Sequence, residues 1–188
     1  DALRERLDLP RDRRVVLMMG GGLGIGPLAR MMRALESTPL PLAAVVITGR
    51  NPRSERRVRA AAETIRYPVR SLSFVDNVYD YMHAADAFVT KPGGLSTAEA
   101  LVAGVPIVLC KPLPGQEERN ARILSEAGAA VRARRVKDLP GTVETILSDS
   151  ARRARMSACA KRLARPAAAG EAASMIARLG RMRQEIVA

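Results

Sequence analysis

A segment near the middle of the chain brings together groups that can hold a phosphate and a sugar. Residues 90–101 read TKPGGLSTAEAL. If a helix begins at Leu95 or Ser96, its first turns carry the hydroxyls of Ser96 and Thr97 and the carboxylate of Glu99. Hydroxyls and free amides at a helix N-terminus can hold phosphate oxygens, and a carboxylate one turn further can accept both hydroxyls of a ribose. The segment therefore predicts a site for a nucleoside diphosphate.

A second segment, KPLPGQEERN at residues 111–120, places Gln116, Glu117 and Asn120 at the start of another helix. Amide and carboxylate groups beside a phosphate site are what the hydroxyls of a sugar need. Ser96 followed by Glu99 also fits a capping box, in which the two side chains only stabilise the helix start. That alternative stays open, but the two segments together favour a nucleotide-sugar as ligand.

A glycine-rich segment, MMGGGLGIGPLARMM, follows the first apolar run of the chain. Such a turn lets the backbone approach an anion at a helix N-terminus. The dinucleotide fingerprint fails, because its last glycine falls on Ile25 or Pro27, and no Walker A lysine follows. Arg50 stands where a ribose-binding acid of an NAD site is expected. An NADP site and a tight turn without ligand remain as alternatives. The glycines are Gly20, Gly21, Gly22, Gly24 and Gly26.

Composition narrows the classes of function. Aromatic residues make up 3% of the 188 residues and Trp is absent, which argues against stacking platforms for single-stranded nucleic acid. Two cysteines, Cys110 and Cys159, and a single His favour neither a disulfide framework nor a zinc site. A hydrophobic content of 47% is enough for a sizeable core. The formal charge of +12 favours acidic partners.

The segment 151–188 contributes +7 of this charge. A solvated face of terminal helices is the simplest interpretation, and contact with anionic lipid headgroups or with nucleic acid are the alternatives. Its basic residues are Arg152, Arg153, Arg155, Lys161, Arg162, Arg165, Arg178, Arg181 and Arg183, opposed by Glu171 and Glu185.

Apolar runs alternate with helical stretches along the chain, which predicts an α/β fold with a parallel sheet flanked by helices. In such a sheet the ligand binds beyond the carboxyl ends of the strands. The expected strands are 14–19, 42–48, 69–74, 86–90, 105–110 and 129–133. The expected helices are 27–37, 54–66, 77–85, 96–104, 116–128 and 137–149.

Four motifs, in this order, resemble the C-terminal donor-binding domain of glycosyltransferase family 28, the type that contains the monogalactosyldiacylglycerol and lipid II synthases. They are GGGLGIGP, GRN, FVDNVYDYMHAADAFVTKPGGLSTAEAL and PLPGQEERNA, within residues 13–150. The resemblance implies a Rossmann-like C-terminal lobe of a two-lobed GT-B fold. It also implies inverting transfer of a sugar from a UDP donor to a lipid acceptor, without metal or other cofactor, because the UDP-sugar is itself a substrate.

The resemblance also assigns roles to residues of the donor site. Gly20, Gly21, Gly22 and Gly24 would face the acceptor cleft and the pyrophosphate, and Ser96 with the amides at Gly94 and Leu95 would hold the diphosphate. Glu99 would take the ribose, the backbone at Phe74 and Val75 the uracil edge, and Gln116 with Glu117 the sugar. Arg50 and Asn51 would line the nucleotide pocket, and Gly93 and Thr97 complete the set.

The domain organisation follows from these motifs. Residues 1–150 are expected to form the donor domain, and 151–188 to form basic helices that pack on it or return to an N-terminal lobe. The chain does not begin with Met, which favours a piece of a longer protein that supplies the general base, so no catalytic residue is assigned. We expect a cytoplasmic location with contact to the inner membrane face. A UDP-sugar 2-epimerase and a non-catalytic nucleotide-binding module are the competing hypotheses.

Overall fold

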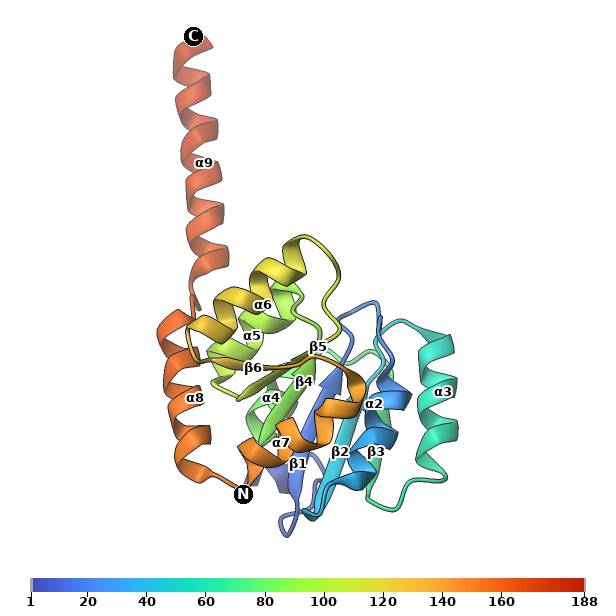
Figure 1. Cartoon of the computed structure of the whole chain (residues 1–188). Coiled ribbons are helices and arrows are strands. Elements are labelled where there is room, and N and C mark those ends of the chain that lie inside the picture. Colours follow the sequence, from blue (N-terminus) through green and yellow to red (C-terminus); the bar gives the residue numbers. More distant parts are fainter. Residues whose placement is uncertain (1, 188) are drawn as a thin grey trace.

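One six-stranded parallel sheet forms the centre of the computed structural model, which describes residues 2–187, with side chains through residue 180 (Figure 1). The strand order is β3-β2-β1-β4-β5-β6, so the direction in which strands are added reverses between β1 and β4. The strands are β1 (Arg14–Met19), β2 (Leu42–Ile47), β3 (Val69–Leu72), β4 (Ala87–Thr90), β5 (Ile107–Cys110) and β6 (Ala130–Ala133).

The central strands are buried on both faces because they are apolar at nearly every position. All residues of β2, β4 and β5 are buried, and β1 is exposed only at Arg14. A parallel neighbour requires a crossover connection, and each crossover here contains a helix. The predicted α/β fold with a parallel sheet is confirmed, and its strands lie within two residues of the expected bounds.

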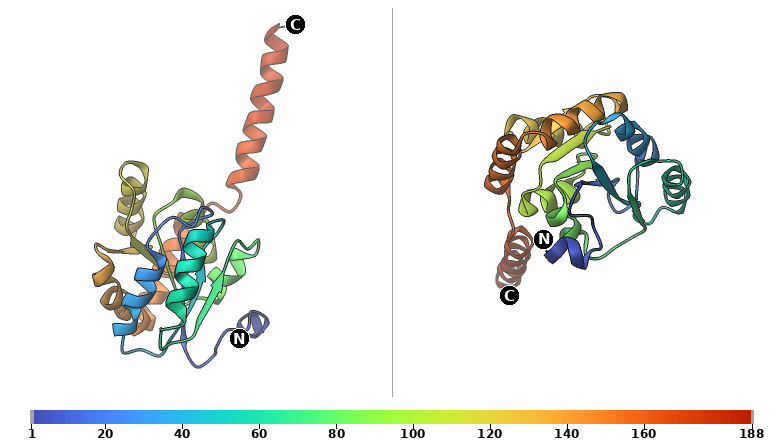
Figure 2. Two further views of the ribbon diagram at one scale, coloured as in Figure 1. Left: turned by 90° about the vertical axis from the view of Figure 1, so that its right-hand side faces the viewer. Right: turned by 90° about the horizontal axis from the view of Figure 1, so that it is seen from below.

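Helices cover both faces of the sheet, as the views in Figure 2 show. One apolar cluster lies beneath α2, α3 and α7, and a second lies beneath α4, α5 and α6. α8 contacts α5 on one side and α7 on the other. The helical elements are α1 (Ala2–Arg6), α2 (Leu28–Ala34), η1 (Leu35–Ser37), α3 (Pro52–Ala62), α4 (Val78–Ala84), α5 (Gly94–Ala103), α6 (Gln116–Glu126), η2 (Val136–Asp138), α7 (Leu139–Leu147), α8 (Ser150–Leu163) and α9 (Ala168–Val187).

Two helices, α3 and α5, begin two residues earlier than expected. α3 begins two residues early, at Pro52, because the side chain of Asn51 caps it and Pro52 fits the first helical position. α5 begins at Gly94, because Gly93 already has the extended conformation of a capping residue. The prediction that Ser96 is the N-cap of this helix is therefore wrong.

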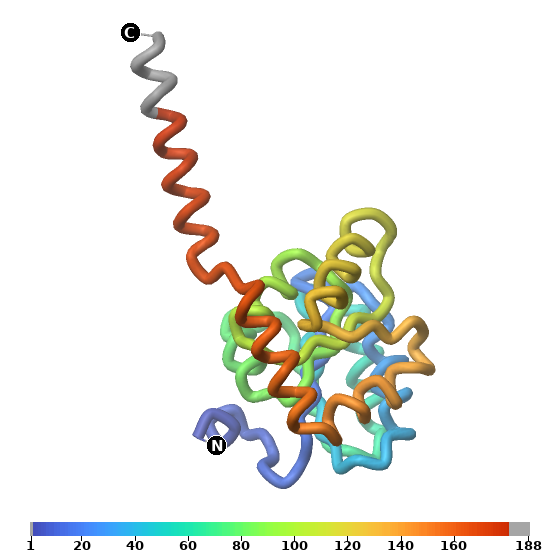
Figure 3. Tube along the Cα trace, turned by 60° about the vertical axis from the view of Figure 1, so that its left-hand side comes forward, coloured from blue at the N-terminus to red at the C-terminus, as the bar shows by residue number. Residues whose placement is uncertain are grey.

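The C-terminal helix α9 extends away from the rest of the molecule (Figures 1 and 3). Every residue from 165 to 180 is exposed, including the apolar Met175, Ile176 and Leu179. The predicted basic side chains of Arg181 and Arg183, and that of Glu185, lie outside the described ones. Among the described residues, no helix is both long and apolar enough to span a membrane.

Candidate functional site

A hollow of about 450 Å³ opens at the carboxyl ends of the strands, beside the point where the strand order reverses. This is where ligands bind in open parallel sheets, because the loops that follow neighbouring strands diverge there. The hollow is lined by the loops after β1, β2 and β3 and by the first turns of α5. Of the predicted donor-site residues, it includes Gly21, Gly22, Phe74, Val75, Leu95, Ser96 and Glu99.

The glycine-rich loop lies against the end of β2 so closely that a side chain cannot fit at one position. A Cβ on Gly24 would lie 1.8 Å from the carbonyl oxygen of Thr48, and Gly24 has a φ of +57°. Two hydrogen bonds close the loop on itself, from Ile25 N–H to the Gly20 oxygen at 3.0 Å and from Gly24 N–H to the Gly21 oxygen at 2.9 Å. The loop therefore has a fixed conformation, held by its own backbone hydrogen bonds and by its contact with Thr48.

Asn51 fixes this loop to α3. Its amide group donates to the carbonyl oxygens of Leu23 and Gly24, both at 3.3 Å, and its Oδ1 accepts the Ser54 N–H at 3.0 Å. The amide nitrogen and the oxygen of the Asn51 side chain, which the resemblance places at the nucleotide pocket, are therefore both hydrogen-bonded within the chain. Arg50, its neighbour, places its guanidinium 4.4 Å from the centroid of the Phe74 ring, at the wall of the hollow.

Ser96 is the third residue of α5, and its side chain is buried. The capping-box alternative requires Ser96 to stand before the helix, so it does not apply here. A Cβ placed on Gly21 would lie 3.9 Å from Ser96 Oγ, so the hydroxyl is directed at the glycine-rich loop. The hydroxyl of Thr97 instead donates to the carbonyl oxygen of Gly93 at 2.7 Å, within its own helix.

Glu99 lies one turn after Ser96 and lines the same hollow. In the described part of the chain, its carboxylate has no hydrogen-bond or ion-pair partner. Desolvation at the wall of the hollow raises the pKa of Glu99 above its ordinary value. A carboxylate left unpaired beside a hollow is available to the hydroxyls of a ligand.

At the start of α6, Glu117 is occupied by the protein itself. One oxygen pairs with the ammonium of Lys91, and the other accepts the Leu113 N–H at 2.8 Å. Asn120 donates to the Pro92 carbonyl oxygen at 3.0 Å, so α6 is joined to the loop after β4. Lys91 is absent from the predicted site residues. Its position directly after a strand at the reversal point was the signal that could have found it.

Gln116 is the first residue of α6 and is exposed. It and Glu117 lie outside the lining of the hollow, and Glu117 is joined to the loop after β4 through Lys91. The predicted site thus consists of two parts, the hollow beside α5 and the start of α6, with Lys91 between them.

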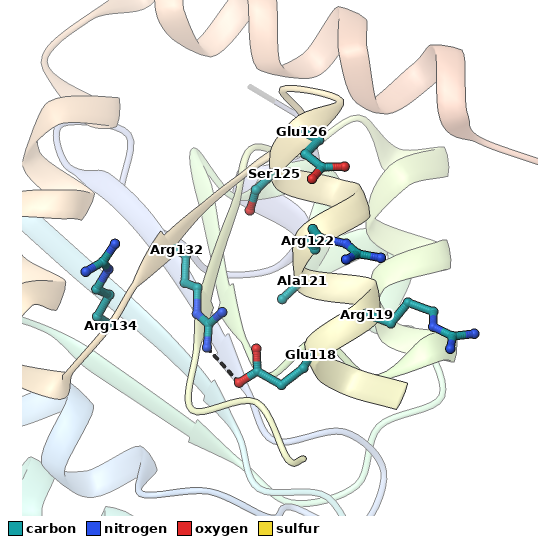
Figure 4. Close-up of a pocket in the computed structure, with 8 residues that line it drawn as sticks. All are labelled: Glu118, Arg119, Ala121, Arg122, Ser125, Glu126, Arg132 and Arg134. Carbon is teal, nitrogen blue, oxygen red and sulfur yellow. Dashed lines mark hydrogen bonds and ion pairs between the residues drawn. The ribbon is translucent and has the colours of Figure 1, made fainter. Parts of the chain in front are cut away.

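A larger groove of about 740 Å³ lies along α6 and β6 and contains none of the predicted site residues. Figure 4 shows Arg132 paired with Glu118, at 2.7 Å, while Arg119 and Arg134 point away from each other on opposite sides. Charged side chains that do not converge fit a solvated surface better than a ligand site. Among the described residues, no group of three His, Cys, Asp or Glu could hold a metal ion.

Comparisons with known proteins agree with the motifs. The model of the glycosyltransferase family 28 C-terminal domain matches residues 15–172. The processive diacylglycerol beta-glucosyltransferase of Bacillus licheniformis is 32% identical over 155 residues, which are 79% of this chain and 39% of that protein. Monogalactosyldiacylglycerol synthase 2, chloroplastic, of Arabidopsis thaliana is 37% identical over 147 residues, which are 73% of this chain and 31% of that protein.

The fold has close counterparts among solved structures. The crystal structure of Acinetobacter baumannii MurG superposes with a TM-score of 0.73 at 23% identity, covering 90% of this chain and 54% of that one. The chain spans less than half the length of the two curated relatives it matches. The predicted resemblance and the predicted Rossmann-like lobe of the GT-B type are confirmed.

Proposed function

The chain belongs to glycosyltransferase family 28 by its C-terminal domain, and from this premise we propose that it is the donor-binding lobe of an inverting glycosyltransferase. The lobe binds a UDP-sugar, and a longer protein that contains it passes the sugar to a diacylglycerol-like lipid. One observation supports this most. Ser96 and Glu99 lie one turn apart on α5, and both line the hollow beside the reversal of strand order.

The nucleoside occupies the hollow. Glu99 accepts the two ribose hydroxyls, since its carboxylate has two oxygens and no partner among the described residues. The backbone near Phe74 and Val75 contacts the uracil edge. The guanidinium of Arg50 stacks on the Phe74 ring. This arrangement uses the apolar wall of the hollow for the base and the single carboxylate for orientation.

The diphosphate lies between the glycine-rich loop and the start of α5. Free amides of Gly94 and Leu95 and the hydroxyl of Ser96 supply donors there, and the helix dipole favours a negative charge. When the sugar leaves, the electron pair of the broken bond stays on the diphosphate. Donors that are already in place stabilise that charge as it develops, which is how this lobe lowers the barrier.

The acceptor is a lipid. Both curated relatives are named for diacylglycerol glycosylation. On this chain, exposed apolar side chains lie at the ligand edge of the sheet, Leu23 and Ile25 on the glycine-rich loop and Leu95 in the first turn of α5. Large exposed apolar side chains grouped at one edge are typical of a surface that another apolar body covers.

The basic segment 151–188 contacts an anionic membrane surface, which brings the lobe to its lipid acceptor. Each Lys or Arg near such a surface contributes on the order of 1 kcal/mol. Co-sedimentation of the chain with vesicles that contain or lack phosphatidylglycerol tests this proposal. Selective binding to the anionic vesicles that weakens in high salt is expected, and equal binding to neutral vesicles contradicts it.

Calorimetric titration with UDP, with ADP and NADP as controls, tests the donor site. We expect saturable binding of UDP alone. The variant Glu99→Ala loses on the order of tenfold in affinity, because two hydroxyls lose a charged acceptor. Glu126→Ala, which removes an exposed glutamate from α6, is the matched control and leaves the affinity unchanged. Equal responses to all three nucleotides would overturn the proposal.

A further inference from the structure

Lys91 is a partly buried cation at the point where the ligand-side loops meet. It follows Thr90, the last residue of β4, and its ammonium pairs with the carboxylate of Glu117 on α6. The two side chains are only 18% and 13% exposed. Since removing charges from water is costly, a largely buried ion pair beside the hollow calls for an explanation beyond joining α6 to the loop after β4.

The position of Lys91 relative to the glycine-rich loop gives that explanation. A Cβ on Gly21 would lie 3.9 Å from Lys91 Cε and 3.9 Å from Ser96 Oγ. A Cβ on Gly93, the residue before α5, would lie 3.5 Å from Lys91 Nζ. A ligand atom held against the backbone of Gly21 therefore lies near both the Ser96 hydroxyl and the Lys91 side chain.

The ammonium also has hydrogen-bonding capacity to spare. A lysine carries three N–H donors, and within the described residues Lys91 Nζ has one acceptor, Glu117. Glu117, in contrast, uses both carboxylate oxygens inside the protein, for Lys91 and for the Leu113 N–H. Its carboxylate is therefore arranged to hold the lysine, while the lysine remains able to bind an anion.

We infer that Lys91 binds the terminal phosphate of the UDP group and that Glu117 is a positioning residue, which holds the Lys91 ammonium beside the glycine-rich loop. This inference rests on the proposed function and adds to it a charged residue for the diphosphate. It also changes the role of Glu117, which the family resemblance assigns to the sugar.

A ligand series on the whole chain separates the diphosphate from the rest of the nucleotide. We expect Lys91→Met to lower the affinity for UDP on the order of 10- to 100-fold, the usual range for a lost hydrogen bond to a charged group. Uridine lacks phosphate, so its affinity for Lys91→Met should stay within about twofold of its affinity for the wild-type chain. Lys91→Arg keeps the charge and should retain most of the UDP affinity.

Lys111→Met is the matched control. Lys111 follows Cys110, the last residue of β5, just as Lys91 follows the last residue of β4, but it is exposed and has no ion pair among the described residues. The Lys111→Met variant therefore removes one positive charge from the same edge of the sheet as Lys91→Met does. A drop in UDP affinity as large as that of Lys91→Met would show a general charge effect and overturn the inference.

The role of Glu117 is tested by a double-mutant cycle on the UDP-to-uridine affinity ratio. If Glu117 acts through Lys91, Glu117→Gln changes this ratio in the wild-type chain but not in a chain that already carries Lys91→Met. A change that persists in both backgrounds shows a direct contact of Glu117 with the ligand, and no change in either shows a purely structural pair. Both results overturn the positioning role.

Failure of the proposed function gives a different result. If the wild-type chain binds neither UDP nor uridine, the donor site itself is wrong, and this inference is wrong with it. If wild type binds UDP and Lys91→Met keeps the same ratio of UDP to uridine affinity, only the role of Lys91 is wrong. Thermal melting of each variant shows whether it folds. Lys91→Gln replaces Lys91→Met if the latter does not fold.

Discussion

At the scale of single residues, the ionised carboxylate of Glu99 lowers the stability of the folded protein. Its carboxylate lines the hollow without a partner among the described residues, and desolvation raises its pKa. The folded chain therefore holds the Glu99 proton more tightly than the unfolded chain does. Protonated Glu99 therefore favours the folded state. This stabilisation is fully present below the ordinary pKa of 4.5 and is lost as the pH rises through the higher pKa of the folded chain.

Glu99→Gln should consequently raise the melting temperature at pH 7 only slightly, because a neutral amide avoids the partial desolvation of a carboxylate that is otherwise exposed to solvent. The difference from wild type should shrink as the pH falls below 4.5, where Glu99 is protonated in both states. Calorimetric melting between pH 4 and 8 measures this, with Glu126→Gln as the control for a glutamate far from the hollow. A difference that stays constant across this range would contradict the prediction.

The residue types predict that Ser96 and Glu99 belong to one site, but they do not determine the local role of Ser96. Ser96 and Glu99 were singled out because a hydroxyl and a carboxylate stand one turn apart. Whether Ser96 caps the helix depended on the ψ angle of Gly93, which residue types do not determine. The pairing of Glu117 with Lys91 depends on two loops from different strands, so no local pattern could predict it.

At the scale of elements, the cap of α3 also shapes the ligand site. Asn51 stabilises the helix start through the Ser54 N–H, and with its other atoms it holds the carbonyls of Leu23 and Gly24. One side chain thus links the stability of a helix to the shape of the glycine-rich loop. The motif GRN therefore supports the glycine-rich loop through Asn51 and contributes Gly49 to the lining of the hollow.

Asn51→Ala should lower the free energy of unfolding by about 1–2 kcal/mol, the usual cost of a lost cap. It should also weaken UDP binding, because the glycine-rich loop loses its connection to α3. Asp149→Ala is the matched control, since Asp149 caps α8 through the Arg152 N–H at 2.9 Å and lies outside the lining of the hollow. Denaturant unfolding and UDP titration of both variants separate the two effects. Equal loss of UDP affinity in both would contradict the role of the loop.

The elements themselves were largely predictable, because continuous apolar runs are typical of buried parallel strands. The helix expected at 137–149 divides into η2 and α7, and the one expected at 27–37 into α2 and η1. Such endings depend on tertiary contacts as well as local propensity, which is why boundaries are the weakest part of a sequence-based prediction.

At the scale of the whole molecule, the segment 151–188, expected to form basic helices that pack on the donor domain or return to an N-terminal lobe, consists of two different parts. α8 contacts α5 and α7, and Arg153 donates to the carbonyl of Leu147, closing the C-terminal end of α7. α9 instead extends from the body with every described side chain exposed. Both parts are Ala-rich, although α8 contains five basic and no acidic residues and α9 three basic and two acidic ones, and neither composition predicts which of the two helices packs on the body.

Removal of α9 should therefore leave the rest of the molecule intact. A chain ending at residue 164 is expected to melt within about 2 °C of the full chain, since a contribution of 1 kcal/mol corresponds to roughly 2–4 °C at this size. Its UDP affinity should be unchanged, because the hollow and Lys91 lie on other elements. A markedly lower melting temperature would show that α9 folds back on the body in solution. An isolated helix of this kind is marginal in water, so an unchanged melting temperature would show that α9, with its exposed Met175, Ile176 and Leu179, does not stabilise the rest of the lobe.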